Sequence, residues 1–207
     1  MKSTVLRALS SCIAALLWVL VTAPQARAGG SSDLREVSTG FARSTAAGDV
    51  LLEVKVSGGY SASSRFEIRL QGDGRLQETT TFVRSEPARA PESRERVLAA
   101  EETDRLFADL VAAGLAGLTN DEFLHQLQGA YPSTVLLLGG SDCATTTILL
   151  RLYTRAGDGL SWEKIDTDLR LECAFGYERA FPGVPSAQAV GVLVRRLKSL
   201  VRSGGEE

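Results

Sequence analysis

The fold is decided by residues 145–172, TTTILLRLYTRAGDGLSWEKIDTDLRLE. Apolar and polar residues alternate in both halves of this stretch, and Gly157-Asp158-Gly159 lies between the halves. A period of two is typical of strands with one buried face, and an Asp-Gly pair tolerates the positive φ angles of a tight turn. The stretch therefore predicts a long hairpin with arms 145–154 and 160–172. Its inward-facing residues would be Ile148, Leu150, Leu152, Ile165, Leu169 and Leu171.

Two cysteines flank this hairpin, because Cys143 and Cys173 each lie fifteen residues from Asp158. A regular hairpin centred on Asp158 would pair them directly. The same register would set Leu150 opposite Asp166 and mix the two faces, which a two-residue period forbids. We therefore expect one β-bulge in the hairpin. In an oxidising compartment the two cysteines predict a disulfide, with two free buried thiols as the alternative.

Further strands are predicted on the N-terminal side of the hairpin. Residues 50–56 and 65–70 alternate in polarity, and the turn Gly72-Asp73-Gly74 leads into a third run that ends at Phe82. Residues 94–98 fit either a short strand or the start of a helix. The apolar run 135–138, VLLL, predicts a buried strand.

Three helices are predicted from their spacing and end signals. The first covers about 100–113, and Gly114 followed by Leu115 fits a Schellman stop. Thr119 and Glu122 form a candidate capping box for a short helix that Gly129 would end. The last runs from an N-cap at Ser186 towards residue 202 with a stripe of leucine and valine. This stripe fits packing on a sheet, and membrane binding is the alternative.

The predicted fold class is α+β, an antiparallel sheet of about five or six strands with two main α-helices packed on it. We expect a single domain over residues 50–202. Residues 29–49 are rich in Gly, Ser, Thr and Ala without an apolar period, which predicts a flexible linker. Residues 203–207 are expected to form a disordered tail.

The first 28 residues have the pattern of a cleavable signal peptide. Lys2 and Arg7 precede the apolar stretch 13–23, which is too short for a membrane-spanning helix. Small residues before the junction of Ala28 and Gly29 predict cleavage there. Lipidation at Cys12 is the alternative, although Cys12 precedes the apolar stretch instead of following it. We therefore expect a periplasmic or extracellular protein, without a membrane span after cleavage.

Charge and motifs exclude several functions. Removal of residues 1–28 leaves 20 basic side chains against 25 acidic ones, a net charge of −5, which disfavours nucleic-acid binding. His125 is the only histidine, so a histidine-rich zinc site cannot form. No nucleophile-elbow or phosphate-loop motif occurs. We therefore predict no catalytic residue, cofactor or metal. Asp166 and Asp168 share a strand face and are the one hint of a carboxylate enzyme site.

The order of elements resembles that of emfourin-type bacterial proteins, which inhibit thermolysin-like metallopeptidases. The resemblance covers roughly residues 50–202. It rests on the Ser-Gly-Gly-aromatic turn at 57–60, the helix that ends at Gly114, the second hairpin and the closing leucine-rich helix. It implies a secreted or periplasmic peptidase as partner, and no inhibitor contact residue is carried over. We therefore expect a non-enzymatic protein-binding module of the bacterial envelope, with an enzyme using Asp166 and Asp168 as the alternative.

Overall fold

A computed structural model describes residues 33–58, 64–83, 87–132 and 143–203. The predicted signal peptide with its Ala28-Gly29 junction and the predicted strand 135–138 lie outside the described residues. So do residues 204–207 of the predicted tail.

Along the described part of the chain, runs of strands are followed by runs of helices. The strands are β1 (Leu34–Ser38), β2 (Phe41–Ser44), β3 (Val50–Ser57), β4 (Ser64–Gln71), β5 (Arg75–Phe82), β6 (Glu92–Val97), β7 (Thr145–Arg155) and β8 (Trp162–Glu172). The helices are α2 (Ala100–Ala112), α3 (Asn120–Ala130), η3 (Ala174–Gly176), α4 (Tyr177–Ala180) and α5 (Pro185–Arg202).

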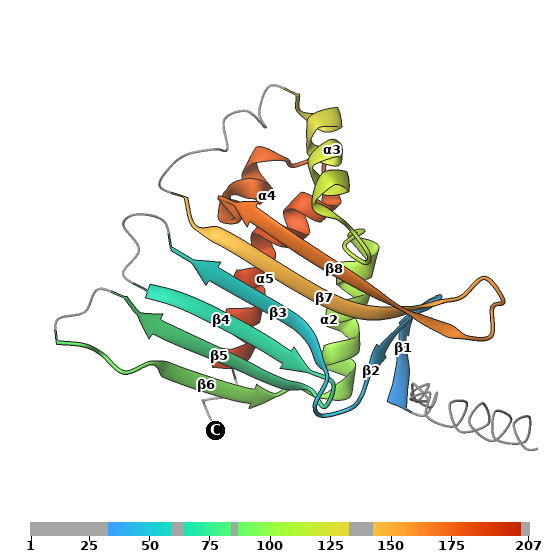
Figure 1. Ribbon diagram of the computed structural model, residues 1–207, viewed down its shortest axis with the longest axis horizontal. Helices are drawn as coiled ribbons and strands as arrows, with labels where there is room; N and C mark the ends of the chain where they lie inside the picture. Colours follow the sequence, from blue (N-terminus) through green and yellow to red (C-terminus); the bar gives the residue numbers. More distant parts are fainter. Residues whose placement is uncertain (1–32, 59–63, 84–86, 133–142, 204–207) are drawn as a thin grey trace, which may run out of the picture. The chain divides into compact units, whose positions relative to one another are not determined.

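The strands of the described residues form one antiparallel sheet of eight strands, in which β7 lies next to the edge strand β8 (Figure 1). β7 pairs with β8 along one edge, and with β3 and then β2 along the other. β4, β5 and β6 follow from β3 in that order, and β1 pairs with β2. The α+β class is confirmed, and the sheet has more strands than the five or six expected.

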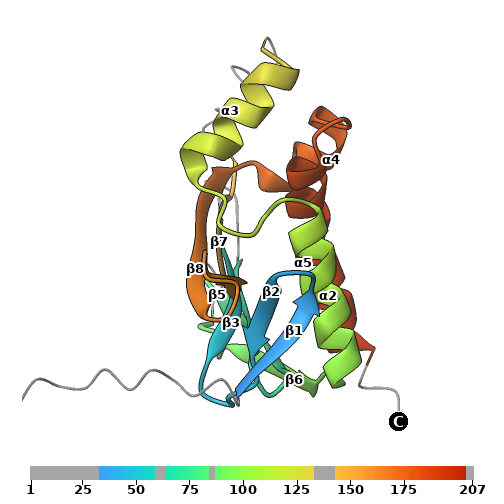
Figure 2. The ribbon, with the colours of Figure 1, turned by 90° about the vertical axis from the view of Figure 1, so that its right-hand side faces the viewer.

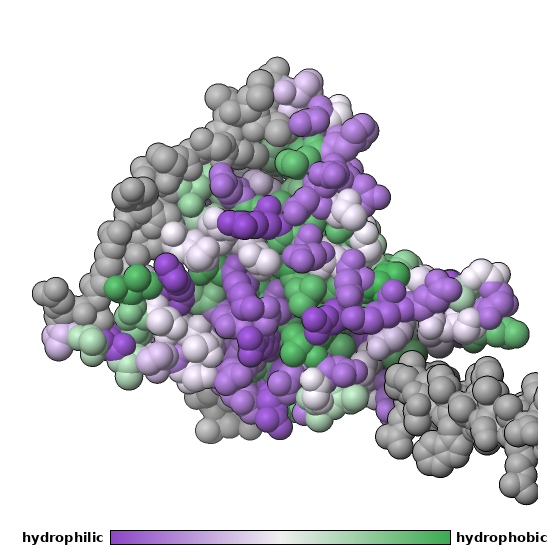
Figure 3. Space-filling model, viewed as in Figure 1, coloured by the Kyte–Doolittle hydropathy of each residue, from purple (hydrophilic) through white to green (hydrophobic). Residues whose placement is uncertain are grey.

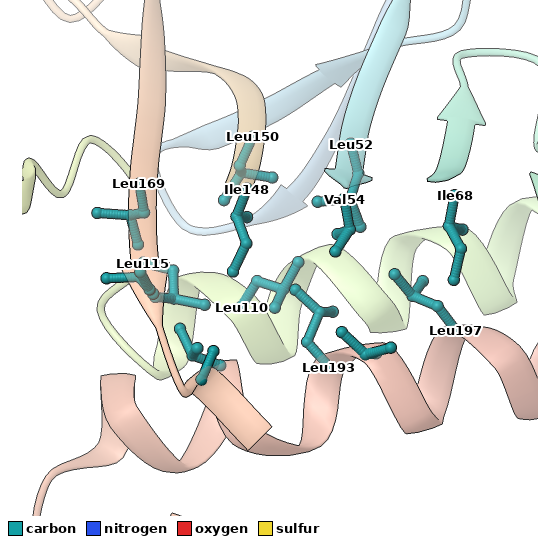
Figure 4. Packing of buried hydrophobic residues seen from close by; sticks show 14 of the residues in the cluster. Leu52, Val54, Ile68, Leu110, Leu115, Ile148, Leu150, Leu169, Leu193 and Leu197 are labelled. Carbon is teal, nitrogen blue, oxygen red and sulfur yellow. The ribbon is translucent and has the colours of Figure 1, made fainter. Parts of the chain in front are cut away.

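Helices α2 and α5 cover one face of this sheet (Figure 2). Their apolar residues meet the inward side chains of β3, β4, β7 and β8 in one buried cluster (Figure 4). The labelled members include Val54, Ile68 and Ile148 from the sheet, and Leu110 and Leu193 from the helices. Burial of the leucine and valine stripe of α5 confirms that this helix packs on the sheet. In the described part of the chain no helix is long and apolar enough to cross a membrane.

The opposite face of the sheet is largely hydrophilic (Figure 3). Cross-strand ion pairs lie on it, among them Arg69 with Glu53 at 2.8 Å. An apolar inner face and a charged outer face are what the two-residue period of the strands predicts.

The prediction of a flexible linker over 29–49 is wrong for residues 33–49, which contain β1 and β2. β2 reads FARS, and its Arg43 is buried, with 2% of its surface exposed. The Arg43 guanidinium donates to Asp104 Oδ1 at 2.7 Å and to the carbonyl of Gly72 at 2.9 Å. Because a charged arginine occupies an inward position, β2 lacks the alternation of apolar and polar residues that predicts a strand. Only the contacts of Arg43 with distant residues explain why it is buried.

The ladder between β7 and β8 runs without a register shift from the Thr145–Glu172 pair to the Arg155–Trp162 pair. The predicted β-bulge is therefore wrong. Ile148 lies opposite Leu169, so the apolar faces match. The turn is centred between Asp158 and Gly159 instead of on Asp158. The pair Cys143–Cys173 is therefore one residue out of the register of the ladder. The chain leaves the strand conformation at Cys173, whose φ is 56°.

The helix ends match most of their predicted signals. Gly114 has a φ of 74°, and the Leu115 amide donates to the carbonyl of Leu110, so the Schellman stop is confirmed. The capping box of Thr119 and Glu122 is confirmed, and α3 ends at Ala130, one residue past Gly129. Helix α5 starts at Pro185, so the N-cap prediction for Ser186 is wrong. Ser186 Oγ instead donates to Gln126 of α3 at 2.7 Å.

Candidate protein-binding site

The end of the β7–β8 hairpin projects beyond the rest of the sheet (Figure 1). We call residues Arg155–Trp162 the tip; their sequence is RAGDGLSW. Two backbone hydrogen bonds close it: the Ala156 amide donates to the Ser161 carbonyl at 3.0 Å, and the Gly159 amide donates to the Ala156 carbonyl at 2.9 Å. Gly159 has a φ of 67°, a conformation that glycine adopts without steric cost.

The Asp158 carboxylate holds the second half of the tip in place. It accepts hydrogen bonds from the amides of Leu160 and Ser161, both at 2.9 Å, and from Ser161 Oγ at 2.7 Å. Hydrogen bonds to the charged form of a carboxyl stabilise that form. The bonds from Ser161 and Leu160 therefore lower the pKa of Asp158 to about 2.

The base of the tip is anchored on neighbouring strands. The Arg155 guanidinium lies over the Trp162 ring, 3.9 Å from its centroid. The Arg155 amide donates to the carbonyl of Gly40, in the turn between β1 and β2, at 3.1 Å. The tip thus continues a supported hairpin and is not a free loop.

Leu160 is the most exposed large apolar residue of the described chain, with 84% of its surface exposed. Hydrophobic surface is visible at the projecting end of the hairpin (Figure 3). The amide of Leu160 is bonded to Asp158, so its backbone is ordered while its side chain points to solvent. Such a side chain can enter an apolar pocket of another molecule with little loss of backbone entropy.

Asp166 and Asp168, the candidates for an enzyme site, are both exposed on the outer face of β8. Asp166 accepts a hydrogen bond from Lys164 Nζ at 2.9 Å. Neither residue lines the depression that contains His125 or the one formed by β3, β4 and β5. An exposed carboxylate beside a lysine is the usual state of a strand face in water, and no geometric feature here favours the enzyme alternative.

Cys143 and Cys173 form a disulfide at the other end of the hairpin, with their Cα atoms 4.9 Å apart. The disulfide prediction is confirmed, and the alternative of two free thiols is wrong. The bond joins the residues that precede β7 and follow β8, so the hairpin is closed by a covalent link at one end and by the tip at the other.

His125 lies exposed on α3, in a shallow depression of about 390 Å³. Ala116, Gly117, Leu118, Glu122 and Gln126 form the rest of its lining. Among the described residues, no group of three histidine, cysteine, aspartate or glutamate side chains is placed to hold a metal ion.

The sequence predicts the Gly-Asp-Gly turn but does not single out Leu160 as a functional residue. The available signal was an apolar residue directly after a turn, where polar residues are usual. A scan against protein-family models and a search of curated proteins give no match. The similarity to emfourin-type inhibitors therefore stays a prediction from the sequence.

Proposed function

We propose that this chain is an exported, non-enzymatic protein-binding module, and that its specific activity is inhibition of a secreted or periplasmic peptidase. The single observation that carries the proposal is the tip, an ordered hairpin end that presents Leu160 to solvent. The Cys143–Cys173 disulfide supports the compartment, because such bonds persist in oxidising surroundings.

The physical argument rests on preorganisation. A loop whose conformation is already ordered loses little conformational entropy when it binds, so more of the contact energy appears as affinity. Transfer of a leucine side chain from water into an apolar pocket contributes about 1.5 to 3 kcal/mol. Peptidases that select large apolar side chains provide such pockets, so an uncleaved tip would occupy one as a substrate side chain does.

The proposal is tested with the full chain and a panel of purified metallopeptidases, with residual activity measured against protein concentration. Inhibition of at least one peptidase is expected. The variant Leu160→Asp should weaken that inhibition by about tenfold to hundredfold, because it removes the apolar anchor.

The matched control is Val97→Asp on β6, since Val97 is also an exposed apolar residue, 64% accessible, but lies outside the tip. Inhibition should be unchanged in this variant. Unchanged activity of every peptidase in the panel would reject the inhibitor proposal, and equal losses in both variants would reject the role of the tip.

A further inference from the structure

The strand that leads away from the tip, β8, has one edge without a partner strand in the described residues. Three hydrogen bonds define which of its residues face that edge. The Cys173 amide donates to Ala144 and the Ala156 amide to Ser161, so odd-numbered residues of β8 bond to β7. The Arg170 amide points the other way and donates to Asn120 Oδ1 at 3.0 Å.

The backbone N–H and C=O groups of Lys164, Asp166 and Asp168 therefore face outward. In the described structure no protein group bonds to these amides, whereas the Arg170 amide is covered by α3. We call Lys164–Asp168 the free edge. Figure 1 shows it as the border of the sheet between the tip and α3. Unpaired strand edges are templates for the addition of another strand.

The shallow depression that contains His125 adjoins this edge. One of its lining residues, Gly117, donates its amide to Thr167 Oγ1 of β8 at 2.8 Å. A strand added along the free edge would place inward side chains towards this depression. Glu122 lines it, and hydrogen bonds from the Thr119 backbone and side chain lower the pKa of Glu122, so its carboxylate is charged at neutral pH.

Charge on this side of the molecule is predominantly negative. The acidic residues of β8 and the first turn of α3 are Asp121, Glu122, Glu163, Asp166, Asp168 and Glu172, against the basic residues Lys164 and Arg170. Asp166 is paired with Lys164 at 2.9 Å and with Arg151 of β7 at 4.0 Å, and the acidic residues still outnumber these three cations. An added segment that carries lysine or arginine would therefore be attracted here, and an acidic one would be repelled.

We propose that the free edge of β8 binds an extended, basic segment of a partner protein by β-strand addition, with one side chain of that segment in the depression beside Gly117. The inference deepens the proposed function and rests on it for the existence of a protein partner. Pairing with a second copy is disfavoured, because two acidic edges would lie side by side.

The test uses amide hydrogen exchange measured by NMR on the full chain. In the free protein the amides of Lys164, Asp166 and Asp168 should exchange fast, and those of Ile165 and Thr167 slowly. The probe is the blocked heptapeptide Lys-Val-Lys-Val-Lys-Val-Lys. At ten times its dissociation constant it should slow exchange at the three outward amides by about tenfold. The Glu-Val counterpart should leave them unchanged.

Two variants at one position separate charge from backbone pairing. Asp166→Asn and Asp166→Pro remove the same charge, but only proline also removes the outward N–H. An edge strand tolerates a proline whose missing N–H would face solvent, so the proline variant is expected to fold. Both should weaken peptide binding, the proline variant more. Should the proline variant fail to fold, the asparagine variant still tests the charge. Glu95→Gln on β6 is the control for loss of an exposed acid elsewhere, and it should bind normally.

The inference is overturned if the basic peptide protects none of the three amides, or if the acidic peptide protects them equally. Protection that rises with protein concentration alone would also overturn it in favour of a second copy. Its failure is distinguishable from failure of the proposed function. If inhibition is lost in Leu160→Asp but kept in Asp166→Pro, the inhibitor proposal stands and the free edge is not the site of peptidase binding.

Discussion

At the residue scale, Asp158 couples the sequence of the tip to its conformation. Its carboxylate bonds to two amides and one hydroxyl of the next three residues, and each bond needs the ionised form to be strong. The folded-state pKa of about 2 lies below the ordinary value of 3.8. The stabilisation is therefore fully present above the ordinary pKa and is lost as the pH falls through the folded one.

We predict that the tip rearranges in acid while the rest of the fold stays intact. The NMR signals of the Leu160 and Ser161 amides should shift with a midpoint near pH 2, the pKa given by the Asp158 hydrogen bonds. In Asp158→Asn this shift should disappear. A midpoint near 4 in the unaltered protein would contradict the hydrogen-bond network described for the tip.

At the element scale, the β7–β8 hairpin is the longest pairing in the sheet, and it is closed at both ends. Cys143 and Cys173 are 30 residues apart in sequence, so their bond restricts a long loop in the unfolded chain. The ladder needs no bulge because the turn is centred between Asp158 and Gly159, and this register already matches the apolar faces of the two strands. Turn geometry, and not the cysteine spacing, therefore sets the register.

We predict that the double variant Cys143→Ser with Cys173→Ser keeps the fold but has a lower free energy of unfolding. The chain-entropy model gives a loss of about 3 to 4 kcal/mol for a loop of this length. Urea denaturation with and without a reductant measures it. The reductant should lower the midpoint of the unaltered protein and leave that of the variant unchanged. Equal midpoints for the unaltered protein and the variant in the absence of reductant would show that the disulfide adds no stability.

At the scale of the whole molecule, helices pack on one face of the sheet, and close contacts between helices determine which small residues are required. Gly191 of α5 faces α4: a Cβ atom at this position would lie 2.7 Å from the Glu178 backbone nitrogen. A Cβ atom at Gly129 of α3 would have no other atom within 4 Å. The two glycines have equal helix propensity but different surroundings.

We predict opposite effects of alanine at these positions. Gly129→Ala should raise the free energy of unfolding by up to about 1 kcal/mol, because alanine is the better helix former. Gly191→Ala should lower it by about 1 to 3 kcal/mol, because α4 must move away. Thermal unfolding of both variants measures these two changes in the free energy of unfolding. A stabilising Gly191→Ala would contradict the described contact between α4 and α5.

Local patterns were sufficient for most elements. The two-residue period of β3, β4, β5, β7 and β8, the Schellman stop at Gly114 and the capping box at Thr119 all depend on neighbours a few residues away in the chain. The disulfide followed from cysteine number and compartment. The patterns missed β1 and β2, where a buried arginine hides the inward face, and they missed the short helices η3 and α4. For β6 the charged sequence left strand and helix both open.

The sequence by itself therefore determined the α+β class, the β7–β8 hairpin and the cysteine pair, since these depend on local period, turn chemistry and composition. Only the tertiary structure decided that Arg43 has Asp104 as its partner, that Leu160 is exposed at a projecting end, and that Lys164–Asp168 has no partner strand among the described residues. The physical reason is that exposure, ion pairing and edge position depend on which distant elements pack nearby, and one-dimensional periodicity does not encode those neighbours.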